Sequence, residues 1–219
     1  MRPLDVIPTI ATTMFLYLIR HGETEFNASG RIQGQSDSPL SDIGCRQCEL
    51  VTQALSRVPL DAVYTSPLRR ALDSARCLAA PRALEPVIDP QLMEINAGIF
   101  QGLDWDEIEL RYPAEARLWK NHDPDFRIPQ GETRRDVMTR ARFAFDAIRK
   151  AGHRHVAVVA HGGLLSAALK SLLEVPAHLN PFELNNCAIS RVSWGKTVKL
   201  LTLNETAHLG DLHRAGGEL

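Results

Sequence analysis

Two histidines stand directly after apolar segments that have the composition of buried strands. Residues 15–19 lead into Arg20 and His21, and residues 155–160 lead into His161. A neutral imidazole can act as a nucleophile and carry a phosphoryl group, and a guanidinium forms forked hydrogen bonds with phosphate oxygens. These residue types in this pattern therefore indicate chemistry on a phosphate group.

Two further polar side chains follow other segments that are typical of strands. Arg70 lies shortly after residues 61–65, and Glu94 lies a few residues after residues 86–89. Because the carboxyl ends of parallel strands meet at one edge of an α/β sheet, we expect both side chains to lie beside His21. Phosphoryl transfer needs cations around the phosphate, an in-line nucleophile and a proton for the leaving oxygen. No metal or other cofactor is expected. The role of nucleophile is assigned to His21 and proton transfer to Glu94, and phosphate binding is assigned to Arg20, Arg70 and His161.

The elements that position these residues are predicted from the hydrophobic pattern. Strands are predicted at residues 15–19, 61–65, 86–89, 155–160, 188–194 and 198–203. Helices are predicted to begin at Ser41, at Ser66-Pro67, at Thr133 and after His161. The last two strands are separated by Gly195-Lys196, which predicts an antiparallel hairpin. The predicted fold class is α/β, a three-layer α/β/α sandwich with a mostly parallel, mixed sheet of about six strands.

The predicted organisation is a single domain over residues 14–219, preceded by a loose N-terminal extension over residues 1–13. Around residues 96–130 the helical pattern loosens into short pieces, which indicates a loop or cap insertion over one edge of the sheet. Glu132 is interpreted as support for the helix start at Thr133. Arg134-Arg135 is interpreted as part of a solvated helix face.

Charge and cysteine content exclude several classes of protein. The chain has 219 residues, with 25 Lys and Arg against 26 Asp and Glu, and a formal net charge of −1. This balance provides no global field for nucleic acid or for an anionic membrane, and no apolar stretch approaches the length of a membrane span. Cys45 and Cys48 form a C-x-x-C without the second pair that a zinc site would need, so we expect reduced thiols in a cytoplasmic protein. The expected partner is a small phosphorylated substrate, and a homodimer is left open.

Six sequence blocks together carry a resemblance to a known family. They are LIRHGETEFN at residues 18–27, RIQGQSDSPL at 31–40, SPLRRA at 66–71, Leu92 to Glu94 with Gly98 and Gln101-Gly102, QGET at 130–133, and VVAHGG at 158–163. In this order and spacing, the chain resembles the phosphoglycerate mutase-like histidine phosphatase superfamily from residue 15 to about residue 205.

This resemblance implies roles for individual residues of the chain. His21 would be the phosphorylated nucleophile, Arg20 and Arg70 would hold the phosphate, Glu94 would donate the proton, and His161 would complete the pocket. Arg70 is selected over Arg69 because the family's arginine directly precedes the alanine of its SPLxRA block. Asn27, Gln33 and Gly34 match positions that contact the phosphate or the substrate, and the backbone N–H of Gly162 is a weaker candidate.

The same resemblance favours hydrolysis over transfer. Mutases of the family carry an Arg-His-Tyr-Gly run just after the acid, whereas residues 95–100 of this chain read INAGIF. The preferred function is a metal-independent phosphomonoester hydrolase that acts through a phosphohistidine on a small phosphorylated metabolite. The alternatives are a cofactor-dependent phosphoglycerate mutase and a non-catalytic module that binds phosphate or protein.

Overall fold

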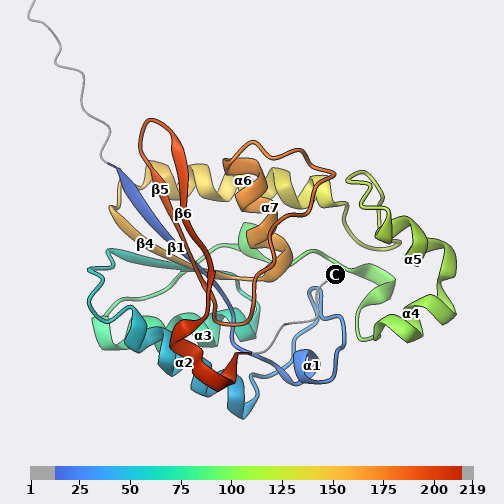
Figure 1. Ribbon diagram of the computed structural model, residues 1–219, viewed down its shortest axis with the longest axis horizontal. Coiled ribbons are helices and arrows are strands. Elements are labelled where there is room, and N and C mark those ends of the chain that lie inside the picture. Colours follow the sequence, from blue (N-terminus) through green and yellow to red (C-terminus); the bar gives the residue numbers. More distant parts are fainter. Residues whose placement is uncertain (1–12, 214–219) are drawn as a thin grey trace, which may run out of the picture.

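The computed structural model describes residues 13–213, which form a six-stranded sheet covered by helices on both faces (Figure 1). The strands are β1 (Met14–Arg20), β2 (Ala62–Thr65), β3 (Val87–Ile88), β4 (His155–Ala160), β5 (Ile189–Trp194) and β6 (Val198–Glu205). The α-helices are α1 (Glu25–Ala28), α2 (Asp42–Ala54), α3 (Arg69–Ala79), α4 (Trp105–Arg111), α5 (Pro113–Lys120), α6 (Arg134–Lys150) and α7 (Gly162–Leu172). Short 3₁₀ helices occur at Ala80–Arg82, Pro90–Leu92, Gly98–Phe100 and Ala207–Leu212.

The strand order of the sheet is β3-β2-β4-β1-β5-β6. The first four strands of this order are parallel to one another, and β5 and β6 continue the sheet in antiparallel fashion. Arg20 is in register with Ala160, and Thr65 is in register with Val159, so β1, β2 and β4 end together. The predicted α/β fold, its mixed and mostly parallel sheet and the hairpin of the last two strands are therefore confirmed.

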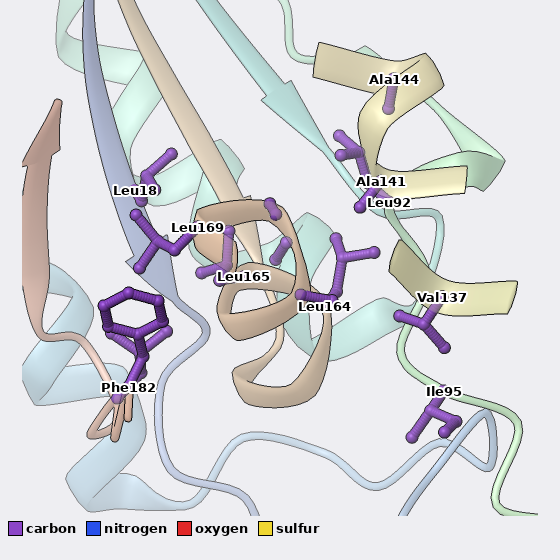
Figure 2. Packing of buried hydrophobic residues seen from close by; sticks show 14 of the residues in the cluster. Leu18, Leu92, Ile95, Val137, Ala141, Ala144, Leu164, Leu165, Leu169 and Phe182 are labelled. Atoms are coloured by element: carbon purple, nitrogen blue, oxygen red, sulfur yellow. The ribbon is translucent and has the colours of Figure 1, made fainter. Parts of the chain in front are cut away.

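Side chains that alternate along the strands build two separate hydrophobic cores. On one face, Leu16 and Leu18 of β1 belong to a core that includes residues of α6 and α7. Figure 2 shows Leu164, Leu165 and Leu169 of α7 in this layer, together with Leu18 of β1. On the other face, a second core joins β1 to α2 and α3. These two layers of helices explain why β1 and β4 are apolar over most of their length, with their polar residues Arg20 and His155 at strand ends, rather than alternating with polar residues.

The predicted helix starts agree with the structure at three positions, including the start of α7 directly after His161, and differ at one. Ser41 caps α2 by accepting a hydrogen bond from the Gly44 N–H at 3.0 Å, and Thr133 forms a capping box with Asp136 at the start of α6. The third helix does not begin at Ser66-Pro67 but at Arg69. The Ser66 hydroxyl instead accepts a hydrogen bond from the Leu68 N–H, which holds a non-helical turn between β2 and α3.

Helices α4 and α5 lie within the segment that was predicted as an insertion and stand at one side of the molecule (Figure 1). Phe100, Ile108 and Trp119 of this segment are buried and belong to the same core as β1. Arg31 also ties it to the loop after β1, through a salt bridge of 2.7 Å to Glu107. The domain limits stay a prediction, and the proposed extension over residues 1–13 lies, apart from Thr13, outside the described residues. Within residues 13–213, no helix combines the length and apolar character that crossing a membrane requires.

Two glycines allow the start of α2 to approach the chain just after β1. A Cβ atom on Gly44 would overlap the carbonyl oxygen of Glu23, and one on Gly22 would lie 2.7 Å from the carbonyl oxygen of Gly44. The N–H of Ser41 also donates a hydrogen bond to the Glu23 carbonyl, at 2.9 Å. The position of the residues that follow β1 therefore depends on the absence of side chains at this contact.

We expect Gly44→Ala to lower the free energy of unfolding by about 1–3 kcal/mol, because the new methyl group cannot fit without moving backbone atoms. This loss should exceed the helix-propensity gain of about 1 kcal/mol. Urea denaturation measures the change. The control is Gln53→Ala, at an exposed position of the same helix, which should stay within about 0.5 kcal/mol of the wild type. Equal stability of the two variants would contradict this account of the contact.

Candidate active site

The catalytic residues expected from the sequence meet at the carboxyl edge of the parallel strands. Arg20 ends β1 and His21 follows it, His161 follows β4, Arg70 lies in the first turn of α3, and Glu94 follows a short 3₁₀ helix. All of these except His161 line one pocket, and the rings of His161 and His21 lie 5.2 Å apart between centroids. The same pocket is lined by the four predicted substrate-binding residues, which are Asn27, Gln33, Gly34 and Gly162.

Two hydrogen bonds fix the orientation and tautomer of the His21 ring. Arg70 Nε lies 3.2 Å from His21 Nε2, and a guanidinium nitrogen can only donate. Nε2 therefore carries a lone pair, and Nδ1 carries the proton that it donates to the Gly22 carbonyl oxygen at 2.7 Å. Burial first, and then the charges of Arg70 and Arg20, hold the pKa of His21 well below its usual range. His21 is thus a neutral imidazole whose unprotonated nitrogen faces a guanidinium.

Both guanidiniums of the site donate hydrogen bonds to backbone carbonyl oxygens. Arg70 Nη2 donates to the Gly34 carbonyl at 2.6 Å, and Nη1 donates to the Ser36 carbonyl at 2.9 Å. The Asp37 carboxylate, at 3.3 Å, is the one acidic group paired with Arg70 among the described residues. Arg20 Nη1 donates to the Leu184 carbonyl at 2.7 Å. Since a carbonyl accepts hydrogen bonds without cancelling a full charge, the carbonyl contacts of Arg70 leave part of its positive charge available to a phosphate.

Glu94 caps helix α7 from a distant part of the chain. His161 occupies the N-cap position of α7 but its side chain makes no capping hydrogen bond. The Glu94 carboxylate accepts hydrogen bonds from the N–H groups of Gly163 at 3.1 Å and Leu164 at 3.0 Å. A Cβ atom on Gly163 would lie 2.7 Å from a Glu94 carboxylate oxygen, so a glycine allows this approach. The helix start thereby fixes the Glu94 side chain within the pocket wall.

The His161 ring is fully buried, and neither of its nitrogens has a hydrogen-bond partner within residues 13–213. Burial and the nearby charge of Arg70 hold its pKa well below the usual value, so the ring is neutral. A buried polar group without a partner costs about 1–3 kcal/mol. Hydrogen bonding to a ligand oxygen beside His21 would remove this cost.

The predicted substrate-binding residues have distinct local environments. The Asn27 side-chain oxygen accepts hydrogen bonds from Thr24, so its amide NH₂ remains to donate. Gln33 is buried, and its side-chain oxygen lacks a partner in the described part of the chain. Gly34 has a φ of +54°, which favours glycine, and its carbonyl holds Arg70. Gly162 is the first residue of α7.

Sequence reasoning missed a pair of charged residues that positions Glu94. Arg140 of α6 donates hydrogen bonds to the backbone carbonyls of Gln91, Met93 and Glu94, and it forms a salt bridge of 3.0 Å with Glu132. The interpretation of Glu132 as support for the helix start was therefore wrong, since Thr133 and Asp136 form the capping box. Residues 132 and 140 are too far apart in sequence for a helical-spacing rule to pair them.

Asn186 was also not predicted as a site residue. Its amide donates to the His21 carbonyl at 2.9 Å and approaches the Asn27 side-chain oxygen at 3.4 Å. It lies in the connection before β5, in a stretch over residues 186–189 that resembles the phosphatase branch of the family but was given no role in the site. The described residues contain no group of three or more His, Cys, Asp or Glu side chains that could hold a metal ion.

Comparison with known proteins places this arrangement in a family. The family model described as histidine phosphatase superfamily (branch 1) matches residues 16–206. The chain is 36% identical over 203 residues to the "Probable phosphoglycerate mutase GpmB" of Yersinia pestis, covering 89% of this chain and 94% of that protein.

Solved structures of similar proteins include two phosphatases. The α-ribazole phosphatase from Shigella flexneri has a TM-score of 0.81 and 29% identity, covering 88% of this chain and 96% of that one. A mycobacterial glucosyl-3-phosphoglycerate phosphatase, solved with VO₃, has a TM-score of 0.79 and 30% identity, covering 88% of this chain and 100% of that one. With the fold, the motifs and the family model in agreement, this chain belongs to branch 1 of the histidine phosphatase superfamily.

Proposed function

We propose that the chain is a metal-independent phosphomonoester hydrolase that acts through a phosphohistidine on His21. The observation that carries this proposal is the neutral His21 ring, with its Nδ1 proton held by Gly22 and its Nε2 lone pair facing Arg70. Arg20, Arg70 and Glu94 line the same pocket. The substrate is a small phosphorylated metabolite, and the phosphatases among the similar structures support this reading.

In the first step, His21 Nε2 attacks the phosphorus atom and the bond from phosphorus to the ester oxygen breaks. The protonated Glu94 carboxyl gives its proton to the departing oxygen, which leaves as an alcohol. Arg20 and Arg70 bind the equatorial phosphate oxygens, and His161 donates to one of them. When the phosphate enters, the Arg70 Nε–H that bonds His21 in the free enzyme turns to a phosphate oxygen.

In the second step, the Glu94 carboxylate takes a proton from a water molecule, and the water oxygen attacks phosphorus. The phosphorus–nitrogen bond breaks, inorganic phosphate leaves, and His21 returns to its neutral form while Glu94 regains its proton. Asn27, Gln33, Gly34 and the Gly162 N–H are assigned to binding the phosphate or the adjoining part of the substrate. Arg20 and Arg70 supply the positive charge that a metal ion supplies in other phosphoryl-transfer sites, and the neutral His161 ring adds a hydrogen-bond donor. A cytoplasmic location remains part of this proposal.

Phosphoglycerate mutase activity is the second candidate, because a relative that is 36% identical carries that name. A mutase must keep its phosphoenzyme from water until the phosphoryl group returns to a substrate. We expect hydrolysis to prevail, so 3-phosphoglycerate should release inorganic phosphate faster than it forms 2-phosphoglycerate, with or without added 2,3-bisphosphoglycerate. Coupled assays of both products measure the ratio. Interconversion that needs the bisphosphate and exceeds phosphate release would establish the mutase instead.

We expect a phosphoenzyme that depends on His21. Wild-type protein mixed with radiolabelled p-nitrophenyl phosphate in chelator and quenched rapidly should carry acid-labile, base-stable label on the protein. His21→Ala should carry none and should lose more than about a thousandfold in kcat, since the nucleophile is gone. The control is His178→Ala, at an exposed position, which should label like the wild type. Unlabelled wild type during turnover, or a labelled His21→Ala, would refute the phosphohistidine.

Two buried neutral histidines also predict a loss of stability in acid. The pKa values of His21 and His161 lie well below the usual value of about 6.5 that applies to the unfolded chain. Below about pH 6.5 the unfolded chain therefore binds more protons, and the free energy of unfolding falls by up to about 1.4 kcal/mol per pH unit for each histidine. Above about pH 6.5 the two histidines are neutral in the folded and the unfolded chain, so this loss of stability is absent.

Urea denaturation at several pH values between about 7.5 and about 5 tests this linkage. His161→Gln should reduce the slope of the stability curve, whatever its effect on stability at neutral pH. His178→Gln provides the exposed control. A slope that is the same in His161→Gln and the wild type would show that His161 is not held neutral.

A further inference from the structure

A second pocket lies beside the catalytic one, between the end of α5, the start of α6 and helix α7. The two pockets share Ile95 and Gly163 in their walls. The second pocket is lined by Ile95, Trp119, Arg134, Val137, Gly163, Ser166, Ala167, Lys170 and Asn180, and it is called the α6/α7 pocket below. Ile95 and Val137, on its apolar side, are labelled in Figure 2.

Arg134 is buried in this pocket, which corrects the expectation that Arg134-Arg135 forms a solvated face. Its side chain is only 9% exposed, and its guanidinium stacks 3.2 Å from the centroid of the Trp119 ring. Nη2 donates to the Trp119 carbonyl oxygen at 3.1 Å. Nη1 is buried and has no hydrogen-bond partner within residues 13–213. The stacking therefore fixes a guanidinium that still has an unused donor.

A second buried cation lies in the same pocket. Lys170 is 3% exposed, and its one polar contact in the described residues is a long hydrogen bond of 3.4 Å to the Ala177 carbonyl. Burial lowers the pKa of Arg134 to about 10, and burial together with the Arg134 charge lowers the pKa of Lys170. Neither side chain forms an ion pair in the described part of the chain, and the exposed Asp123 acts on Arg134 only at longer range.

Burying two like charges in the lining of one pocket without a carboxylate is unfavourable, because desolvation and mutual repulsion both raise the free energy of the folded state. An anion that entered the pocket would satisfy Arg134 Nη1 and Lys170 Nζ together. The cavity volume of about 40 Å³ exceeds the roughly 10–15 Å³ that one water molecule needs, so the pocket has room for a larger polar group.

We propose that the α6/α7 pocket binds a second anionic group of the substrate, a carboxylate or a second phosphate, while the catalytic pocket holds the phosphate that is hydrolysed. This inference rests on the proposed function and names its substrate class, a phosphomonoester with a second negative group. Lys170 lies seven residues after Gly163 on α7, which is about 10 Å along the helix axis. The two anionic groups of the substrate are therefore separated by a short chain and not directly adjacent.

The test compares pairs of substrates that differ only in the second charge. Phosphooxy-carboxylic acids of increasing chain length are each paired with the alkyl phosphate of the same length, and the matching alkanediol bisphosphates form a third set. For the wild type, we expect kcat/KM to be about ten- to a hundredfold higher for the best substrate that carries a second negative group than for the alkyl phosphate of the same length. The set that contains this substrate identifies the second group as a carboxylate or a phosphate.

Arg134→Met and Lys170→Met remove one charge each and keep an apolar stem. Each variant should lower kcat/KM by about tenfold or more for the substrates with a second negative group. The kcat/KM for the alkyl phosphates should stay within about threefold of the wild-type value. The matched control is Arg135→Met, which removes the neighbouring exposed arginine and should change neither value. Circular dichroism and thermal unfolding verify that each variant folds, and Lys170→Met decides the matter if Arg134→Met does not fold.

The outcomes separate this inference from the function on which it rests. Hydrolysis of the alkyl phosphates with no preference for a second charge, or equal losses on both kinds of substrate in the variants, would overturn the inference and leave the phosphatase intact. Absence of hydrolysis and of phosphoenzyme with every substrate would overturn the proposed function itself. A selective loss in Arg134→Met or Lys170→Met, but not in Arg135→Met, would establish the second anionic site.

Discussion

The interaction on which the site depends is the hydrogen bond from Arg70 Nε to His21 Nε2. It requires a neutral His21, and the Gly22 carbonyl on the opposite nitrogen selects the tautomer that leaves this lone pair in place. The close contact between Gly22 and Gly44 sets the path of the chain around the ring. In the proposed mechanism this buried imidazole acts as the nucleophile, and the two guanidiniums that keep it unprotonated also attract the phosphate.

Backbone carbonyl oxygens accept hydrogen bonds from the cations in and around the buried site. Arg20, Arg70 and Arg140 all donate to carbonyl oxygens, and these oxygens satisfy hydrogen-bonding capacity without neutralising a full charge. Where a carboxylate is present, as with Glu132 beside Arg140, the pair lies behind Glu94 and fixes its backbone. Arg70 combines its carbonyl contacts with one carboxylate, Asp37, whereas the pair of Arg140 and Glu132 supports the backbone that carries Glu94.

Local patterns in the sequence predicted the features that depend on short segments. The apolar runs before His21 and His161 became β1 and β4, and the caps at Ser41 and Thr133 start α2 and α6. The residues whose roles were not predicted correctly are positioned by contacts between segments that are distant in sequence. Glu132 pairs with Arg140, Asn186 reaches His21, and Arg134 is covered by Trp119 from α5. An arginine at a helix start looks the same in sequence whether it faces solvent or an aromatic ring, so only the tertiary packing distinguishes Arg134 from the exposed Arg135.

Helix α7 links the catalytic pocket to the α6/α7 pocket. Its first N–H groups hold the Glu94 carboxylate, and its Lys170 side chain lies in the second pocket near the other end. Because an α-helix is stiff over this length, the distance between Glu94, the proposed proton donor, and Lys170 is set by the fold and not by loop motion. Selection among phosphomonoesters would then follow from a fixed separation between two anion sites. Relatives that share the catalytic residues could differ in substrate through changes at the start of α6 and the end of α7, with no change in the chemistry at His21.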